Sequence, residues 1–385
     1  MFGIHLGGKH EKVIAVADIG SGSAAVALLA RGDDNRMRIL GAERRVLPYE
    51  ERASEATVAG IGKQLVEAGQ HVLERHKTKN GALPSAVYAV IRAPWARSKT
   101  VRTRSKFEQE TRITGDMIGG LAHQGLGEDT ELDHNNILEA SVIRVELNGY
   151  PTNQPEGKAA YDLSVAALIS DCDPGMRSTL TSSLSQLFGA PTPLMRSGTH
   201  ALLSVLRGRP GEPRNYLIVD MASEGTNLIV MRDGITADHA FIAEGKHSIL
   251  KRITGSGMPE DTLSKLRMIA RGDCNDPTCA SISEAMGKAE PELVRVFGET
   301  MGKLVTRERL PNDLILATHG DLIPWLSTFF TRIDFTQFTT TTQPFQVDAL
   351  EPADFAHWAL PEAGVDVDTG LSIASALVNI EESRA

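Results

Sequence analysis

Two aspartates occupy equivalent places in two hairpin-like stretches of the sequence. Residues 216–234 hold an apolar run that ends in Asp220, then a small polar turn and a second apolar run. Residues 13–29 repeat this design, with Asp18 before the turn Gly20-Ser21-Gly22-Ser23. Short apolar runs that flank a tight turn predict buried β-hairpins. A carboxylate at such a turn can hold a hydrated metal ion, and the N–H groups of the turn can bind phosphate.

The two stretches also match position by position when they are aligned on their aspartates. The alignment pairs Ile19 with Met221, Ser21 with Ser223, and Val26 with Leu228. Two such units in separate halves predict a duplicated fold that holds one phosphate chain from both sides. Either hairpin alone favours an ordinary structural hairpin in an α/β core, whereas the pair favours a nucleotide.

A third stretch has the pattern of a ligand-binding edge. Residues 313–317 form an apolar run that enters the turn Thr318-His319-Gly320-Asp321, and residues 323–330 have a helical pattern. A strand, a glycine-bearing turn and a helix N-terminus form a common ligand edge of α/β sheets.

The composition sets limits on the function. With 385 residues, of which 41% are hydrophobic and 23% charged, the chain is long enough for two domains of a globular protein. The net charge of −9 gives no support for binding to nucleic acid or to anionic membranes. No apolar run is long enough to span a membrane, and the N-terminus does not resemble a signal peptide. Cys172, Cys274 and Cys279 form no disulfide framework. We therefore expect a cytoplasmic protein.

The remaining elements suggest how these turns are placed. Residues 92–106 carry six basic residues and no acid, which is compatible with nucleic-acid binding but fits better a strand with one solvated face. We divide the chain into a first domain, an inserted α+β subdomain with a strand, a helix and a hairpin, return helices, and a second domain with a helical part near residues 245–310. The boundaries are 1–86, 87–171, 172–213 and 214–385, in that order.

The order of these pieces resembles the actin-like ATPase superfamily, and within it the families of the bacterial cell-division protein FtsA and the type IV pilus protein PilM. The first phosphate motif of these families matches Asp18-Ile19-Gly20-Ser21-Gly22-Ser23, and the second corresponds to residues 220–227. Their adenosine motif corresponds to residues 318–321. The loop from Gly149 to Gly157 is similar to one in the small domain that FtsA-like proteins insert into the first half.

The resemblance implies a fold and a ligand. The fold is α/β, with actin-like (ribonuclease H-like) duplicated domains and a small α+β insertion in the first half. The ligand is ATP or ADP with Mg²⁺, which Asp18 and Asp220 would hold through water. The nucleotide-binding residues that the resemblance implies are Asp18, Gly20, Ser21, Gly22, Ser23, Asp220, Ser223, Glu224, Gly225, Thr226, Gly320 and Asp321.

Several positions depart from the family pattern. A glycine-rich second turn would let phosphate approach closely, but here it reads Ala222-Ser223-Glu224, and Glu224 adds a negative charge. Asn227 replaces an aspartate, and His319 and Asp321 crowd the adenosine turn. We therefore predict nucleotide binding with at most weak ATPase activity, and no catalytic residue is assigned.

The function we expect is a cytoplasmic actin-like scaffold in cell division or pilus assembly, acting through self-association and partner binding. The sequence ends soon after an apolar helix at residues 370–380, with no amphipathic tail of the FtsA kind, so we expect no direct membrane insertion. A membrane-bound partner would then recruit the protein to the inner membrane, as PilM binds a short cytoplasmic peptide. One alternative is a nucleotide-free pseudo-ATPase that serves as an interaction module. A small-molecule kinase of the same superfamily would need a general-base aspartate, and no kinase motif stands out.

Overall fold

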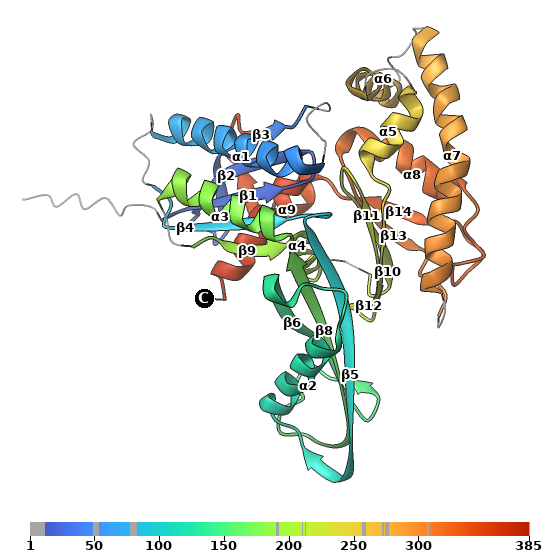
Figure 1. Cartoon of the computed structure of the whole chain (residues 1–385). Helices are drawn as coiled ribbons and strands as arrows, with labels where there is room; N and C mark the ends of the chain where they lie inside the picture. Colours follow the sequence, from blue (N-terminus) through green and yellow to red (C-terminus); the bar gives the residue numbers. More distant parts are fainter. Residues whose placement is uncertain are drawn as a thin grey trace, which may run out of the picture. The chain divides into compact units, whose positions relative to one another are not determined.

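The computed structural model describes residues 12–48, 54–77, 83–189, 192–209, 211, 213–255, 259–271, 273, 277–305 and 308–384. The chain divides into two compact units (Figure 1). Unit 1 comprises residues 1–90, 175–196 and 352–385, and unit 2 comprises residues 91–174 and 197–351.

Unit 1 is built on a mixed sheet of six strands in the order β15-β3-β2-β1-β4-β9. β1 is buried along its whole length, as expected for a strand in the middle of a sheet covered on both faces. Helix α1 packs on β2 and β3, and α9 packs on β1, β2 and β3. The bounds are β1 Val13–Ile19, β2 Ser23–Arg31, β3 Met37–Val46, α1 Ser54–Lys77, β4 Ala86–Ile91, α3 Pro174–Phe188, β9 Leu194–Ser197, η4 Pro352–Phe355, β15 Ala359–Pro361 and α9 Thr369–Glu382.

The C-terminal segment belongs to unit 1, whereas the sequence placed it with the second domain at residues 214–385. β15 pairs in parallel with β3 through residues 359–361 and 37–39. At the end of α9, Glu382 accepts hydrogen bonds from Lys12 and Tyr88. β4 also lies in the first sheet, so the insertion begins after this strand and not at residue 87.

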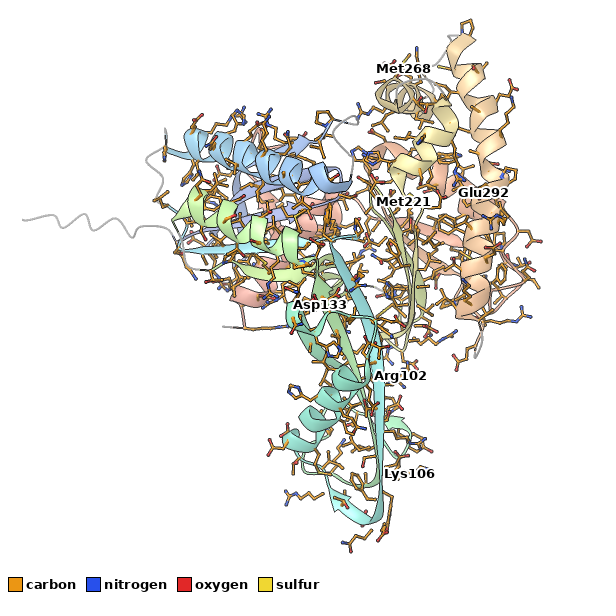
Figure 2. The ribbon with its side chains drawn as sticks, viewed as in Figure 1. Arg102, Lys106, Asp133, Met221, Met268 and Glu292 are labelled. Carbon is orange, nitrogen blue, oxygen red and sulfur yellow. The ribbon has the colours of Figure 1, made fainter. Side chains whose placement is uncertain are left out.

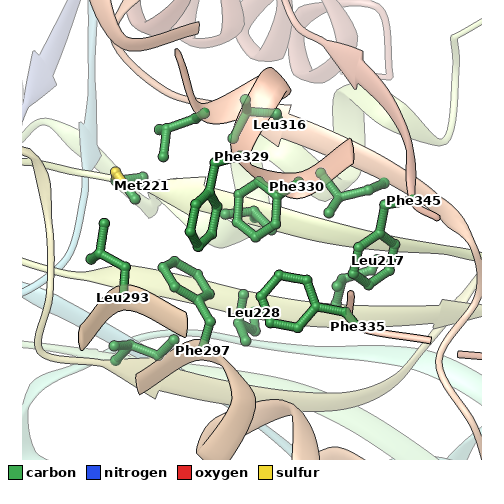
Figure 3. Close-up of a cluster of buried hydrophobic side chains, with 14 of the residues drawn as sticks. Leu217, Met221, Leu228, Leu293, Phe297, Leu316, Phe329, Phe330, Phe335 and Phe345 are labelled. Atoms are coloured by element: carbon green, nitrogen blue, oxygen red, sulfur yellow. The ribbon is translucent and has the colours of Figure 1, made fainter. Parts of the chain in front are cut away.

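Unit 2 contains a second sheet of five strands in the order β12-β11-β10-β13-β14. Its apolar face packs against α5, α7 and α8, and the core includes five phenylalanines: Phe297, Phe329, Phe330, Phe335 and Phe345 (Figure 3). The bounds are α4 Gly198–Leu206, β10 Tyr216–Met221, β11 Thr226–Arg232, β12 Ile235–Ile242, α5 Lys246–Thr254, α6 Pro259–Arg271, α7 Pro277–Leu304, β13 Asp313–Ala317, η3 Gly320–Leu322, α8 Ile323–Arg332 and β14 Gln346–Ala349.

The inserted α+β segment of unit 2 is a four-stranded antiparallel sheet, β5-β8-β6-β7, covered on one face by α2. Thr114 caps α2 by accepting a hydrogen bond from the Met117 amide, as its position predicts. The bounds are β5 Ala96–Arg112, α2 Gly115–Glu128, η2 His134–Asn136, β6 Ile137–Leu147, β7 Tyr150–Pro151 and β8 Ala159–Cys172.

The basic stretch of residues 92–106 lies largely in β5 and alternates as the strand interpretation predicts. Thr103 is buried, while Arg102, Arg104 and Lys106 are exposed. Figure 2 shows Arg102 and Lys106 along this strand. Arg104 pairs with Asp162 on the neighbouring β8, so part of the basic charge is neutralised within the sheet.

The structure bears on the expectations about membrane spans and about the cysteines. In the ranges given above, no helix is long and apolar enough to cross a membrane. The sequence led us to expect no disulfide framework among the three cysteines, and the structure shows Cys279, in α7, as disulfide-bonded. Cys172 keeps its thiol, buried at the end of β8, and Cys274 lies outside the described residues.

Candidate functional site

The two predicted hairpins are present, and they have the same turn. In the first, Asp18 pairs with Ala25 and Ile19 with Ala24, which leaves residues 20–23 to turn the chain. In the second, Asp220 pairs with Asn227 and Met221 with Thr226, which leaves residues 222–225. Each aspartate therefore stands one pair before the end of its ladder, as the alignment of the two sequences predicts.

The first turn is held tightly and contains an unused polar group. The Gly20 amide donates to the Ser23 carbonyl at 2.9 Å, and the Leu47 amide donates to the Gly22 carbonyl at 2.9 Å. The Ser21 hydroxyl is buried and has no hydrogen-bond partner among the described residues. A buried hydroxyl without a partner is costly, so Ser21 is suited to an oxygen-rich ligand such as phosphate.

Asp18, predicted as a metal ligand, is engaged by an arginine of unit 1. Nη2 of Arg44, on β3, lies 2.6 Å from Oδ2 of Asp18. The same guanidinium donates through Nη1 to the Ser23 hydroxyl, at 2.9 Å, and through Nε to Asp368, at 2.5 Å. Burial opposes the charge on Arg44, but Asp368 and Asp18 outweigh burial and raise its pKa.

These contacts determine whether Mg²⁺ fits at Asp18. The side chain of Asp18 is only 2% exposed and that of Arg44 is 23% exposed. Breaking a buried ion pair costs about 3–5 kcal/mol when one partner is left uncompensated. Mg²⁺ takes oxygen ligands in a near-octahedral shell and gives up water reluctantly, so a carboxylate already bonded to a guanidinium is a poor place for it. The turn suits phosphate, whereas Asp18 does not suit the metal.

Arg44 and Asp368 also line a cavity. Its volume is about 610 Å³, and its walls are residues 40–44, the end of α1 and residues 363–368, all in unit 1. A cavity of this size can hold a small molecule. Of the cluster, Arg44 and Asp368 therefore face this cavity, whereas Asp18 is not among its lining residues.

The second turn is braced by the N-terminus of α5. The amides of Lys246 and His247 donate to the carbonyls of Ala222 and Ser223, at 3.0 and 2.9 Å. A Cβ on Gly245 would lie 2.5 Å from the Gly225 nitrogen, so only glycine allows this approach. The amides of Lys246 and His247, at the start of α5, are thus already bonded to the turn.

The side chains of Asp220, Glu224 and Thr226, at the second turn, also have partners within the protein. Glu224 bonds to Nδ1 of His247 at 2.5 Å, so the carboxylate predicted to face the phosphates has a protein partner. Asp220 accepts a hydrogen bond from Asn227 at 3.4 Å and lies 4.0 Å from Nη1 of Arg92. The Thr226 hydroxyl donates to the Glu244 carbonyl at 2.6 Å. These contacts commit three of the predicted ligand side chains of this turn to partners within the protein.

The third predicted turn lies beside the second. β10 and β13 are parallel neighbours, and Asp220 pairs with Ala317, so Thr318 follows at the same carboxyl edge of the sheet. The Thr318 hydroxyl is buried without a partner among the described residues. A Cβ on Gly320 would meet nothing within 4 Å. Open space and an unused hydroxyl at a carboxyl edge are typical of a ligand site in α/β sheets.

Asp321 is less available than the sequence predicted. Oδ1 and Oδ2 of Asp321 accept hydrogen bonds from Arg267 of α6, at 2.5 and 2.7 Å. Burial would raise the pKa of Asp321, but the hydrogen bond from Arg267 and the nearby His319 hold that pKa below its usual range. Its side chain therefore stabilises the turn, and its contribution to a ligand is limited to the backbone.

Sequence reasoning missed Arg44 and Asp368 as site residues, and it placed Thr318 in the third turn without giving its hydroxyl a role. Arg44 lies 26 residues from Asp18 and Asp368 lies 324 residues from Arg44, so no local pattern joins them. Asp368 does carry one signal, because an aspartate before an apolar helical run predicts an N-cap. Its side chain caps α9 by accepting from the Leu371 amide.

Comparison with solved structures identifies the fold. No family profile matches the sequence, and a search of curated proteins finds no match. Among solved structures, PilM of a PilM–PilN type IV pilus biogenesis complex superposes with a TM-score of 0.62 at 11% identity, covering 96% of this chain and 98% of that chain. The chain has an actin-like ATPase fold.

Two other similar structures with this fold score lower. The ethanolamine utilization protein EutJ from Carboxydothermus hydrogenoformans has a TM-score of 0.45 at 9% identity, with 95% of this chain and 90% of that chain covered. A Bacteroides thetaiotaomicron protein with an actin-like ATPase fold has a TM-score of 0.38 at 10% identity, with 91% and 96% covered. The actin-like fold hosts many activities, so the ligand has to be argued from the turns.

Proposed function

We propose that this protein is a nucleotide-binding scaffold that acts in the manner of PilM, by docking onto a partner protein in pilus assembly. The observation that carries the proposal is the likeness to PilM along nearly the whole of both chains. PilM in that structure is part of a complex with PilN. A scaffold role fits a site whose turns are formed but whose charged side chains are mostly engaged within the protein.

The proposed ligand is ATP or ADP. Its phosphates would contact the first turn at residues 20–23 and the second at residues 222–226, and its nucleoside would contact residues 318–321. The buried hydroxyls of Ser21 and Thr318, both without partners among the described residues, support this assignment. In this proposal the nucleotide is a structural ligand whose binding favours the conformation that docks onto the partner.

Calorimetric titration of the full chain with ATP and ADP tests the ligand. Replacing Ser21 by Ala removes the donor that would meet phosphate, and we expect about tenfold weaker binding from one lost charge-assisted hydrogen bond. The same change removes a buried unsatisfied group, so thermal stability should not fall. Ser182→Ala, on the exposed surface of α3, is the matched control and should bind as the wild type does. Equal affinity in the wild type and Ser21→Ala contradicts the assignment.

A partner assay tests the scaffold role separately. The probe is a labelled synthetic peptide with the sequence of the cytoplasmic segment of the inner-membrane pilus protein from the same genome, and a scrambled peptide is the control. Fluorescence anisotropy should show saturable binding of the native peptide only. Binding of a peptide from the division tubulin homologue, with none of the pilus peptide, would move the protein to cell division.

A nucleotide-free interaction module is the second candidate. It is favoured by the second turn, where Glu224 is bonded to His247 and Gly245 packs against the Gly225 nitrogen. Under this alternative, ATP produces no heat at millimolar concentration, and the peptide binds with the same affinity in the presence and absence of nucleotide. The two assays together therefore separate the candidates.

A further inference from the structure

The cluster around Asp18 has the composition of an internal cation site whose cation is an arginine. Four hydrogen bonds join Arg44 to its surroundings: Nε to Asp368, Nη1 to Ser23, and Nη2 to both Asp18 and Asp368. A guanidinium has five N–H donors. These bonds leave one N–H without a bond to the described residues. It is on Nη1, the nitrogen whose other N–H donates to Ser23 of the first turn.

The cluster is fixed by the packing of α9 as well as by charge. A Cβ on Gly370, in the first turn of α9, would lie 2.6 Å from Oδ2 of Asp18 and 3.3 Å from Nη2 of Arg44. The helix N-terminus therefore lies directly against the carboxylate, which its dipole favours. Asp368 caps this helix and also holds Arg44, so Asp18, Arg44 and α9 form one connected unit.

Arg44 is the member of this cluster that can donate to a polyphosphate. Asp18 and Asp368 offset its charge, so the contact we assign to phosphate is the one N–H left on Nη1. A nucleotide phosphate chain needs positive charge and hydrogen-bond donors, and arginine supplies both in a fixed planar fork. Mg²⁺ at this carboxylate would instead compete with Arg44, which already binds Oδ2 of Asp18. In the described part of the chain, no group of three or more acidic, histidine or cysteine side chains gathers to hold a metal.

We propose that Arg44 takes the place of Mg²⁺ at the first phosphate turn, so that this protein binds the polyphosphate of a nucleotide without a divalent ion. This inference rests on the proposed nucleotide binding. It makes Arg44 a binding residue that contacts phosphate from the Ser23 side, and it makes Asp18 a positioning residue that orients the guanidinium. The protein then binds the phosphate chain of free ATP, and its affinity for ATP does not depend on the concentration of Mg²⁺.

The test compares the affinity of the full chain for ATP in excess EDTA and in excess Mg²⁺. Wild-type affinity should change by less than about threefold between the two conditions. Arg44→Met keeps the apolar stem but loses the charge, so binding in EDTA should fall by at least tenfold. Since Arg44 then no longer occupies Oδ2 of Asp18, added Mg²⁺ should restore part of the binding. Arg45→Met, one residue along β3, is the matched control and should behave as the wild type does.

Asp18→Asn provides a second variant if Arg44→Met does not fold. It removes a negative charge but keeps a side-chain oxygen that can still accept from Arg44, and Arg44 stays bonded to Asp368. The orientation of the guanidinium is therefore kept, and we expect tighter ATP binding in EDTA. Wild-type binding that disappears in EDTA and returns with Mg²⁺, or loss of binding in Asp18→Asn, overturns the inference while the proposed nucleotide function stands. Absence of ATP binding under every condition overturns both.

Discussion

The close approach of Gly245 to the second turn predicts that even a methyl group at this position destabilises unit 2. In Gly245→Ala, the new Cβ would lie 2.5 Å from the Gly225 nitrogen, 2.6 Å from the Ser223 oxygen and 2.7 Å from the Ala222 oxygen. All three are backbone atoms, so no side chain can rotate away. Gly245 has φ −140° and ψ −169°, a conformation open to alanine, so the effect is purely steric.

The turn or α5 must therefore shift by about 1 Å, and we expect a loss of about 1–3 kcal/mol in the free energy of unfolding. For a unit of this size, such a loss lowers Tm by roughly 3–10 °C. Differential scanning calorimetry measures it. Gly287→Ala is the matched control, because its Cβ meets nothing within 4 Å on the exposed face of α7. Removing a helical glycine should raise stability by about 0.5–1 kcal/mol. If Gly245→Ala has the same Tm as the wild type, the close packing of α5 on the turn is refuted.

Three further predictions concern unit 2. The pKa of Asp321 is lowered by Arg267 despite burial, so the ion pair stabilises the fold above about pH 4 and is lost on acidification. The difference in stability between the wild type and Asp321→Asn, measured from urea midpoints, should therefore shrink as the pH falls from about 5 to 3. Burial lowers the pKa of His239 to about 4, below its unfolded value of about 6.5. Wild-type Tm should thus fall as the pH drops from about 6.5 to 4, and the slope should be flatter in His239→Gln. Phe330 is fully buried, with ring centroids 5.2 Å from Phe297, and calorimetry of Phe330→Ala should show a loss of about 3–5 kcal/mol.

The elements that the sequence predicted correctly are those with local causes. The two hairpins follow from short apolar runs around a turn, and each aspartate lies in the second-to-last residue pair before its turn. The alternation of Arg102, Thr103 and Arg104 indicated a strand with one solvated face, which β5 is. The Thr114 cap of α2 was likewise readable from a few neighbouring residues.

What the sequence did not reveal depends on contacts between distant segments. β15 and α9 return to the first sheet because β15 pairs with the edge of β3, and no pattern within residues 352–385 indicates which sheet they join. The engagement of Asp18 by Arg44, of Asp321 by Arg267 and of Glu224 by His247 is equally non-local. Motif matching identified the turns, but the charge partners of their carboxylates decide the chemistry they can do.

Hydrogen exchange measured with and without ATP tests the central claim most directly, because it reads each turn separately in the intact chain. The proposed nucleotide function predicts slower amide exchange at residues 20–23, 222–225 and 318–321 when ATP is present, with little change along β5 of the insertion. Unchanged exchange at all three turns under saturating ATP, or protection confined to segments elsewhere in the chain, would contradict it.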